Sequence, residues 1–184
     1  ILALAFALRI IGIGWGLPNE SRVESLHPDE PIVALVAGSL DPLGGKFDPG
    51  FYNYGTLYLS VSRLVAPPAT PETVDHYRSR LLTMRFVNAF AGVASVAVLY
   101  VLLRRRSQAS ALAGSAILAI APGFVVHSKF ATVDVFATFL VISCLAVADK
   151  LLHQSVRAEK IAAAAGLLAG LAGGTKYNFL LVSV

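Results

Sequence analysis

The sequence predicts an all-α, polytopic bundle of transmembrane helices, with amphipathic surface helices in its first extracytoplasmic loop. Of its 184 residues, 56% are hydrophobic and only 14% are charged, whereas a soluble domain carries roughly 25% charged residues. The mean hydropathy is +0.70. Several apolar stretches also approach the length of about 20 residues that a membrane-spanning helix needs. Much of the surface is therefore expected to face lipid.

The expected spans follow from these apolar stretches. They cover residues 1–17, 81–103, 109–126, 131–148 and 161–173, with a further span starting near 177. A cleaved signal peptide is an alternative for the first stretch, but no small-x-small cleavage site follows it. Because the sequence starts and stops inside apolar stretches, we expect it to be a piece of a larger membrane protein, truncated at both ends. The single cysteine allows no disulfide within the chain.

Residues 18–80 form the expected extracytoplasmic loop and differ in kind from the spans. They hold eight of the eleven acidic residues. Two apolar stretches within them, 31–40 and 54–66, are too short to cross a bilayer and predict amphipathic helices at the membrane surface. The linker between them, DPLGGKFDPGFYN, is rich in Gly, Pro and Asp, which indicates turns.

Positive charge predicts the orientation of the chain. Arg104 to Arg106, and the 149–160 loop with its three basic residues, fall on one side of the membrane, and the acidic 18–80 segment falls on the other. Since cytoplasmic loops collect Lys and Arg, the 18–80 segment is expected to be extracytoplasmic, together with the 127–133 turn and the Gly174–Lys176 break. The same rule explains the net charge of +4 without a nucleic-acid partner.

The extracytoplasmic face also collects the charged side chains that have no evident role in solvation. They are Asp29, Glu30, His127, Lys129, Asp134 and Lys176. A carboxylate inside a span is costly, so Asp134 is a functional-site hypothesis by default. Two carboxylates and several cations at one membrane surface predict either a polar substrate site or an ion path.

Each acid also has a structural alternative. Asp29 and Glu30 stand directly before a proline at the expected start of a helix, which is an ordinary N-cap arrangement. Asp134 could form a structural ion pair with Arg9 or Arg85.

The basic residues of the 127–133 turn have alternatives as well. His127 precedes Asp134 by seven residues, and the two share a helix face if the fourth span starts early. Otherwise His127 and Lys129 belong to an ordinary solvated loop.

Five segments, taken in order, carry a resemblance to a known family. They are HPDEP, FYNYGTLYLSVSRL, RFVNAFAGVASVAVLYVLLRRR, APGFVVHSKFATVDVFATF and GLLAGLAGGTKYNFLL. Together they resemble the N-terminal half of a GT-C glycosyltransferase, closest to the protein O-mannosyltransferase and aminoarabinose-transferase-like group. The resemblance covers essentially all of the chain.

The resemblance implies a multi-pass enzyme of the cell (inner) membrane with its active site on the extracytoplasmic face. Such enzymes move a sugar from a polyprenyl-phosphate carrier, with inversion, to a hydroxyl of a protein, lipid or glycan acceptor. By match to the first-loop motif, Asp29 would be the general base and Glu30 its partner. The substrate-binding positions implied for this chain are Tyr54, His127, Lys129, Asp134 and Lys176.

The chemistry of the residues agrees with these implied roles. An acceptor hydroxyl is a poor nucleophile until a carboxylate takes its proton, and a leaving lipid phosphate needs cations more than an acid. The sequence departs from the aminoarabinose-type pattern in the stretch YNYGTL, which lacks the phosphate-binding lysine of that subgroup. Arg85 matches a common family arginine, but snorkelling to the interface is the favoured interpretation of it.

Three alternatives stay open at this level. A transporter would use His127, Asp134 and Lys176 to line an ion or substrate path, and it would favour broken helices at mid-bilayer. A non-catalytic lipid-binding or scaffold protein would tolerate loss of Asp29 and Asp134. No residue is assigned as a metal ligand, because His27 with two acids is a weak pattern, but a divalent cation remains an alternative cofactor.

Overall fold

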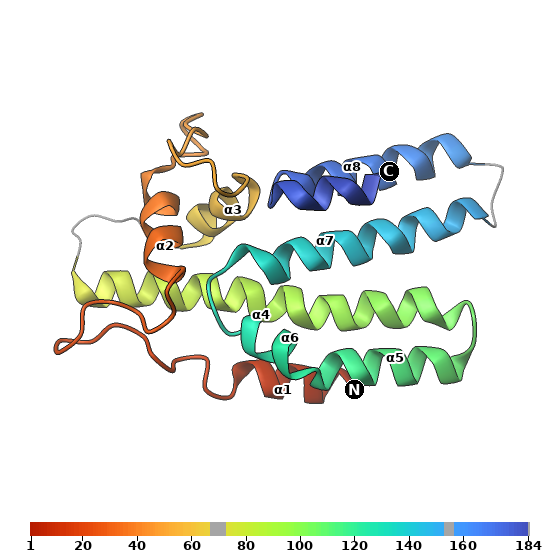
Figure 1. Cartoon of the computed structure of the whole chain (residues 1–184), viewed down its shortest axis with the longest axis horizontal. Helices are drawn as coiled ribbons and strands as arrows, with labels where there is room; N and C mark the ends of the chain where they lie inside the picture. Colours follow the sequence, from red (N-terminus) through yellow and green to blue (C-terminus); the bar gives the residue numbers. More distant parts are fainter. Residues whose placement is uncertain (67–72, 153–156, 184) are drawn as a thin grey trace.

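The computed structural model describes residues 1–66, 73–152 and 157–183, and this part of the chain is all-α, as predicted. Figure 1 shows the longer helices running side by side, with α2 and α3 gathered at one end. In chain order the helices are α1 (Leu2–Ile10), α2 (Glu30–Ser39), α3 (Leu57–Val65), α4 (Val74–Arg104), α5 (Gln108–Ile120), α6 (Pro122–His127), α7 (Val133–Ala148), the 3-10 helix η1 (Asp149–Leu152), α8 (Ala158–Gly173) and the 3-10 helix η2 (Tyr177–Ser183).

Two helices of the described part are long and apolar enough to cross a membrane: α4, and α7 continued through η1. Only 33% and 22% of their most apolar windows are buried, so most of their apolar surface is free to face lipid. The 31 residues of α4 extend about 46 Å at 1.5 Å per residue, which exceeds a hydrocarbon core of roughly 30 Å. Its apolar stretch begins at Leu81, so the first turns of α4 project beyond it, at the end that carries α2 and α3 (Figure 1).

Two expected spans are broken within the chain. The 1–17 stretch is helical only to Ile10. Ile11 leaves the helical region with ψ of 118°, and the glycines that follow, Gly12 and Gly16, adopt φ of 77° and 69° and do not resume a helix. The 109–126 stretch forms two helices, α5 and α6, in place of one. Pro122 has no backbone N–H and pushes Ala121 to ψ of 116°, which ends α5 before the proline.

The C-terminal spans are partly as expected. The predicted 131–148 helix matches α7, and the 161–173 stretch lies within α8. The chain after 177 forms η2, a 3-10 helix, where a span was expected to start. η2 packs back along α8, and Leu180 lies so close to Gly173 that a side chain at position 173 would collide with it.

The basic loops that were predicted to be cytoplasmic meet at the end of the bundle opposite α2. Arg105 and Arg106 form ion pairs with Asp149 at 3.0 Å and 3.3 Å. These ion pairs join the turn after α4 to the end of α7, and both segments lie on the right side of Figure 1. Residues 153–156 of the predicted 149–160 loop lie outside the described residues.

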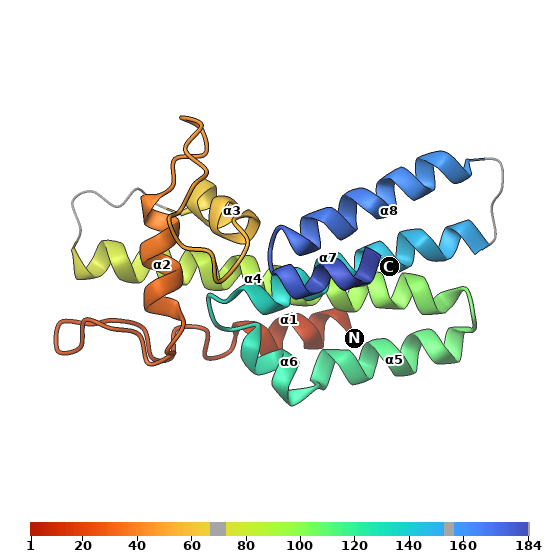
Figure 2. The same cartoon turned by 45° about the horizontal axis from the view of Figure 1, so that its top comes forward.

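The main apolar core lies where the first loop meets the bundle. Val33 of α2, Leu59 of α3, Met84 of α4 and Val133 of α7 are all buried in it. Both predicted surface helices form, and α2 runs across α4 in both views (Figures 1 and 2). The first loop is thus a packed cap on one end of the bundle; its residues 67–72 lie outside the described residues.

Candidate active site

Glu30 joins the first loop to the bundle through a buried ion pair. Its carboxylate is fully buried and accepts from Arg85 Nε at 2.8 Å and from Arg85 Nη2 at 2.6 Å. It also accepts from the backbone N–H of Ala131 at 2.7 Å and from the hydroxyl of Ser25. These contacts use both oxygens of Glu30, and they tie the start of α2 to α4 and to the turn before α7.

Arg85 is buried in the interior, so the favoured interpretation of it as a snorkelling side chain is wrong. It is only 1% exposed, and its Nη1 donates to the carbonyls of Ile13 and Trp15, both at 2.7 Å. Its guanidinium also lies 5.1 Å from the ring centre of Phe130. The hydrogen bonds of Arg85 to the Glu30 carboxylate and to two backbone carbonyls stabilise its buried position, because such charge-assisted bonds are stronger in the protein interior than at the membrane interface.

Asp29 occupies the N-cap position of α2 but does not act as a cap. Its side chain forms no capping hydrogen bond. Its backbone N–H donates to His27 Nδ1 at 3.3 Å, and the ring of His27 stacks on Phe130 at 4.4 Å between centroids. Within the described residues, the half-buried carboxylate of Asp29 is left without a hydrogen bond or ion pair. It is therefore available for chemistry in a way that Glu30 is not.

Asp134 and Lys176 form an ion pair between the start of α7 and the break after α8. The Asp134 carboxylate and the Lys176 ammonium lie 2.5 Å apart, and their side chains are 43% and 29% exposed. The alternatives that paired Asp134 with Arg9 or Arg85 are therefore wrong. The pair lies at the surface, so it can exchange partners with a bound ligand at modest cost.

Tyr54 lies within electrostatic reach of both Asp29 and this ion pair. Burial raises the pKa of the Tyr54 phenol, and the negative charges of Asp29 and Asp134 raise it further, while Lys176 opposes them. The three charged groups therefore act on one hydroxyl. The structure brings four of the predicted site residues into one cluster, made of Asp29, Tyr54, Asp134 and Lys176.

A short backbone pairing holds the two halves of this cluster together. The N–H of Gly55 donates to the Thr175 carbonyl at 3.1 Å, and that of Leu57 donates to the Gly174 carbonyl at 2.9 Å. A Cβ at position 55 would lie 2.1 Å from the Gly174 carbonyl oxygen, so this approach requires glycine at position 55. This contact was not predicted from the sequence, although both segments, YNYGTL and GGTK, carry glycines.

Gly55→Ala is expected to destabilise the protein by about 1–3 kcal/mol, because the new methyl group must push the two backbones apart. Gly166→Ala is the matched control, since Gly166 lies in α8 with nothing within 4 Å of an added Cβ. Alanine there should be neutral or slightly stabilising. Thermal unfolding of the two variants checks this, and an equal midpoint for both would contradict the close approach at Gly55.

His127 and Lys129 are not part of this cluster. His127 is the last residue of α6 and is exposed, and α7 starts only at Val133. His127 and Asp134 therefore lie on separate helices and do not share a helix face. The Lys129 ammonium donates to the Ile11 carbonyl at 2.7 Å, where it satisfies the end of α1.

Asn88 is a buried polar residue of α4 that the sequence analysis did not single out. Its side-chain amide donates to the carbonyls of Phe130 and Thr132, each at 2.6 Å. It thereby fixes the turn that presents Asp134. A polar side chain inside an apolar span was the available signal.

The described ranges contain no group of three or more His, Cys, Asp or Glu side chains that could hold a metal ion. In the pattern considered for a divalent cation, His27 Nδ1 faces the Asp29 N–H and Glu30 is committed to Arg85.

The comparison with protein families identifies the chain. A family model described as dolichyl-phosphate-mannose-protein mannosyltransferase matches residues 70–184, more than half of the chain, and confirms the resemblance to this group. No curated protein and no solved structure matches the chain significantly. The matched part includes Arg85, Asp134 and Lys176, while Asp29 and Tyr54 precede it. The chain belongs to the dolichyl-phosphate-mannose-protein mannosyltransferase family and is thus a glycosyltransferase of the mannosyltransferase type.

Proposed function

We propose that the cluster of Asp29, Tyr54, Asp134 and Lys176 is the transfer site of a membrane mannosyltransferase. The enzyme moves mannose from a polyprenyl-phosphate carrier to a hydroxyl of an acceptor outside the cytoplasm, for which the family name favours a protein. The observation that carries the proposal is the uncommitted carboxylate of Asp29, whose charge acts on the Tyr54 phenol together with the charges of the half-exposed Asp134–Lys176 pair. A free base and a cation at one surface are what this transfer needs.

The proposed reaction is a single displacement. The Asp29 carboxylate takes the proton of the acceptor hydroxyl, and the acceptor oxygen forms a bond to C1 of the sugar. The bond between C1 and the phosphate oxygen breaks on the opposite side, and its electron pair leaves with the polyprenyl phosphate. Attack and departure on opposite faces invert the configuration at C1.

The other residues of the cluster support this step. Lys176 supplies positive charge to the leaving phosphate, where a positioned cation lowers the barrier. Asp134 holds Lys176 and borders the sugar. The Tyr54 phenol, whose pKa is raised further by burial and by nearby negative charge, can donate a hydrogen bond to an oxygen of the sugar donor. Glu30 and Arg85 act through Asp29, because their ion pair fixes the start of α2.

The proposed sidedness rests on charge. The cluster lies at the end of the bundle that carries α2 and α3, and Arg104 to Arg106 lie at the other end (Figure 1). Basic residues mark the cytoplasmic side, so the cluster faces outward from the cell (inner) membrane. The short helices α2 and α3 then lie along the membrane surface, where a lipid-linked donor meets a water-soluble acceptor.

Transport remains the alternative function, and the described structure offers it less support. The proposed path required His127 together with Asp134 and Lys176. His127 is exposed on α6, which is separate from the ion pair that joins α7 to the break after α8.

Lys176→Gln is expected to lower kcat for mannose transfer by about 10²–10³-fold, which is the usual cost of losing one group that stabilises developing negative charge. The measurement is transfer from labelled polyprenyl-phosphate mannose by the full-length protein. Lys46→Gln is the control, since it removes the same charge from an exposed residue of the first loop. Wild-type protein that moves no mannose from this donor would refute the proposed function, and an unchanged kcat in Lys176→Gln would refute the role of Lys176.

A further inference from the structure

A tight turn between α2 and α3 carries the most exposed large apolar side chain of the described residues. Leu43, at the tip of this turn, is 89% exposed, and Phe47, directly after the turn, is 54% exposed. The linker between the two surface helices was predicted only to form turns, so neither side chain was assigned a role. Two large apolar side chains held out from one turn indicate a surface that an apolar partner covers.

Hydrogen bonds fix the shape of this turn. The N–H of Asp41 donates to the Lys46 carbonyl at 3.0 Å, and the N–H of Lys46 donates to the Asp41 carbonyl at 2.8 Å. Just after the turn, the Asp48 carboxylate accepts from the N–H of Gly50 at 2.9 Å and from the hydroxyl of Tyr52 at 2.8 Å. The two apolar side chains are therefore presented by a closed and ordered segment.

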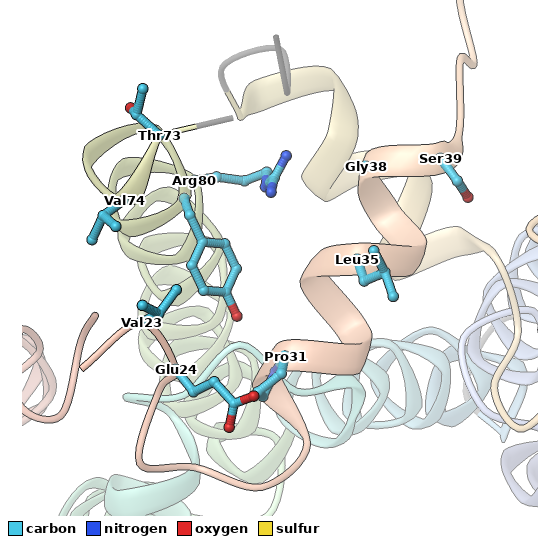
Figure 3. A pocket seen from close by; sticks show the side chains of 10 residues that line it. Val23, Glu24, Pro31, Leu35, Gly38, Ser39, Thr73, Val74 and Arg80 are labelled. Carbon is cyan, nitrogen blue, oxygen red and sulfur yellow. The ribbon is translucent and has the colours of Figure 1, made fainter. Parts of the chain in front are cut away.

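The turn is separate from the cavity of about 640 Å³ between α2 and α4. Leu35 and Ser39 of α2 line that cavity, and the chain leaves it after Ser39 (Figure 3). Leu43 and Phe47 do not line it. Both side chains therefore face away from the described bundle.

The base of the turn sets its depth relative to a bilayer. Leu40, directly before the turn, is buried in the same core as Leu81 and Met84 of α4. The apolar stretch of α4 begins at Leu81, so this core lies at the boundary of the hydrocarbon when α4 crosses the membrane. The segment after α2 projects to the side of the bundle, across the direction of α4, in both views (Figures 1 and 2). The tip of the turn therefore extends along the membrane surface.

We propose that this turn is an interfacial membrane anchor, with the side chains of Leu43 and Phe47 inserted among the lipid acyl chains. Leucine and phenylalanine are among the side chains that gain most by leaving water for lipid. The segment carries two acids, Asp41 and Asp48, against one lysine, Lys46. Apolar burial therefore drives the insertion, and attraction to anionic lipid does not. The anchor holds the C-terminal end of α2 at the membrane surface.

The test measures lipid contact at single positions of the full-length protein, with every native cysteine replaced by serine. Leu43→Cys and Phe47→Cys are each labelled with a nitrobenzoxadiazole fluorophore and reconstituted in phosphatidylcholine vesicles. Nitroxide groups on the acyl chains of these lipids quench a fluorophore that touches them, so both labels should lose most of their fluorescence. Glu20→Cys is the matched control, an exposed position of the same loop. The segment between α1 and α2 reaches beyond the N-terminal end of α4, so a label there should stay bright (Figure 1). A label at 43 that is quenched no more than the label at 20 would overturn the proposal.

Leu43→Asp tests whether the apolar tip drives the contact. A carboxylate is costly in hydrocarbon, so the label at position 47 should be quenched several-fold less in this variant. Because Leu43 is so exposed, the substitution should leave the unfolding midpoint in detergent unchanged. Unchanged quenching at position 47 would overturn the role of Leu43. Quenching that appears only after phosphatidylglycerol is added would overturn the apolar mechanism. A label at 43 that responds to an acceptor peptide and not to the nitroxide lipids would overturn the proposal in favour of an acceptor-binding surface.

Discussion

Asp29→Asn is expected to lower the rate of mannose transfer by about 10²–10⁴-fold, the range typical for loss of a general base. Asparagine keeps the size of the side chain but cannot take a proton from the acceptor hydroxyl. The fold should be unaffected, because the Asp29 carboxylate forms no hydrogen bond or ion pair in the described part of the chain. Transfer assays and thermal unfolding of the full-length protein measure the two effects separately.

The comparison with Asp29→Ala distinguishes catalysis from capping. Replacing a capping aspartate by alanine usually lowers the stability of the protein by about 0.5–2 kcal/mol, and asparagine caps about as well as aspartate. Because Asp29 makes no side-chain cap, both variants should unfold close to the wild-type temperature, and both should be inactive. Asp75→Asn is the matched control, an exposed acid in the first turn of α4. If Asp29→Asn transfers mannose at the normal rate, Asp29 is not the base, and a non-catalytic role for the motif regains support.

The long apolar helices could be predicted from the sequence because their hydrophobicity and length alone are enough to identify them. Runs such as 81–103 and 131–148 bury little in the protein and need only a lipid environment, so local composition predicted α4 and α7. The ends of the shorter spans depended on single residues. α1 ends at Ile10, directly before Ile11 and the positive φ of Gly12, and Pro122 divides α5 from α6.

The candidate site was predictable in its residues but not in its pairings. Asp29, Asp134 and Lys176 stood out because charge is rare and costly in such a chain. Which cation would pair with Asp134 depended on where the break after α8 docks, and that contact runs through the backbone of Gly55 and Gly174. Backbone pairing between distant segments leaves almost no trace in the sequence, so Arg9 and Arg85 were the wrong candidates.

The Glu30–Arg85 pair could not be predicted from the sequence either. Its two residues are 55 positions apart, and each had an ordinary local explanation, as a helix cap and as an interfacial arginine. Only the packed first loop brings them together, with Ala131 from a third segment completing the contacts. The two adjacent acids therefore have different roles, because the pair with Arg85 occupies Glu30 while the Asp29 carboxylate makes no hydrogen bond or ion pair within the described residues.

Glu30→Gln is expected to destabilise the protein by about 3–5 kcal/mol, because it leaves the Arg85 guanidinium buried without its counter-charge. Glu30 is fully buried and Arg85 is 1% exposed, so water cannot replace the lost partner. At the roughly 2–4 °C per kcal/mol that applies to a chain of this length, the unfolding midpoint should fall by about 6–20 °C. Glu20→Gln, an exposed acid in the same loop, should change it by less than about 2 °C.

The double variant Glu30→Gln with Arg85→Met tests whether the pair itself causes this loss. Removing both charges takes away the uncompensated cation, so the double variant should be more stable than Glu30→Gln alone. It should still be less stable than the wild type, because the carbonyls of Ile13 and Trp15 lose their donor. Transfer activity should stay low in both variants, since the start of α2 no longer holds Asp29 in place. A double variant no more stable than Glu30→Gln would show that the lost stability comes from packing around Glu30 and not from the charge of Arg85.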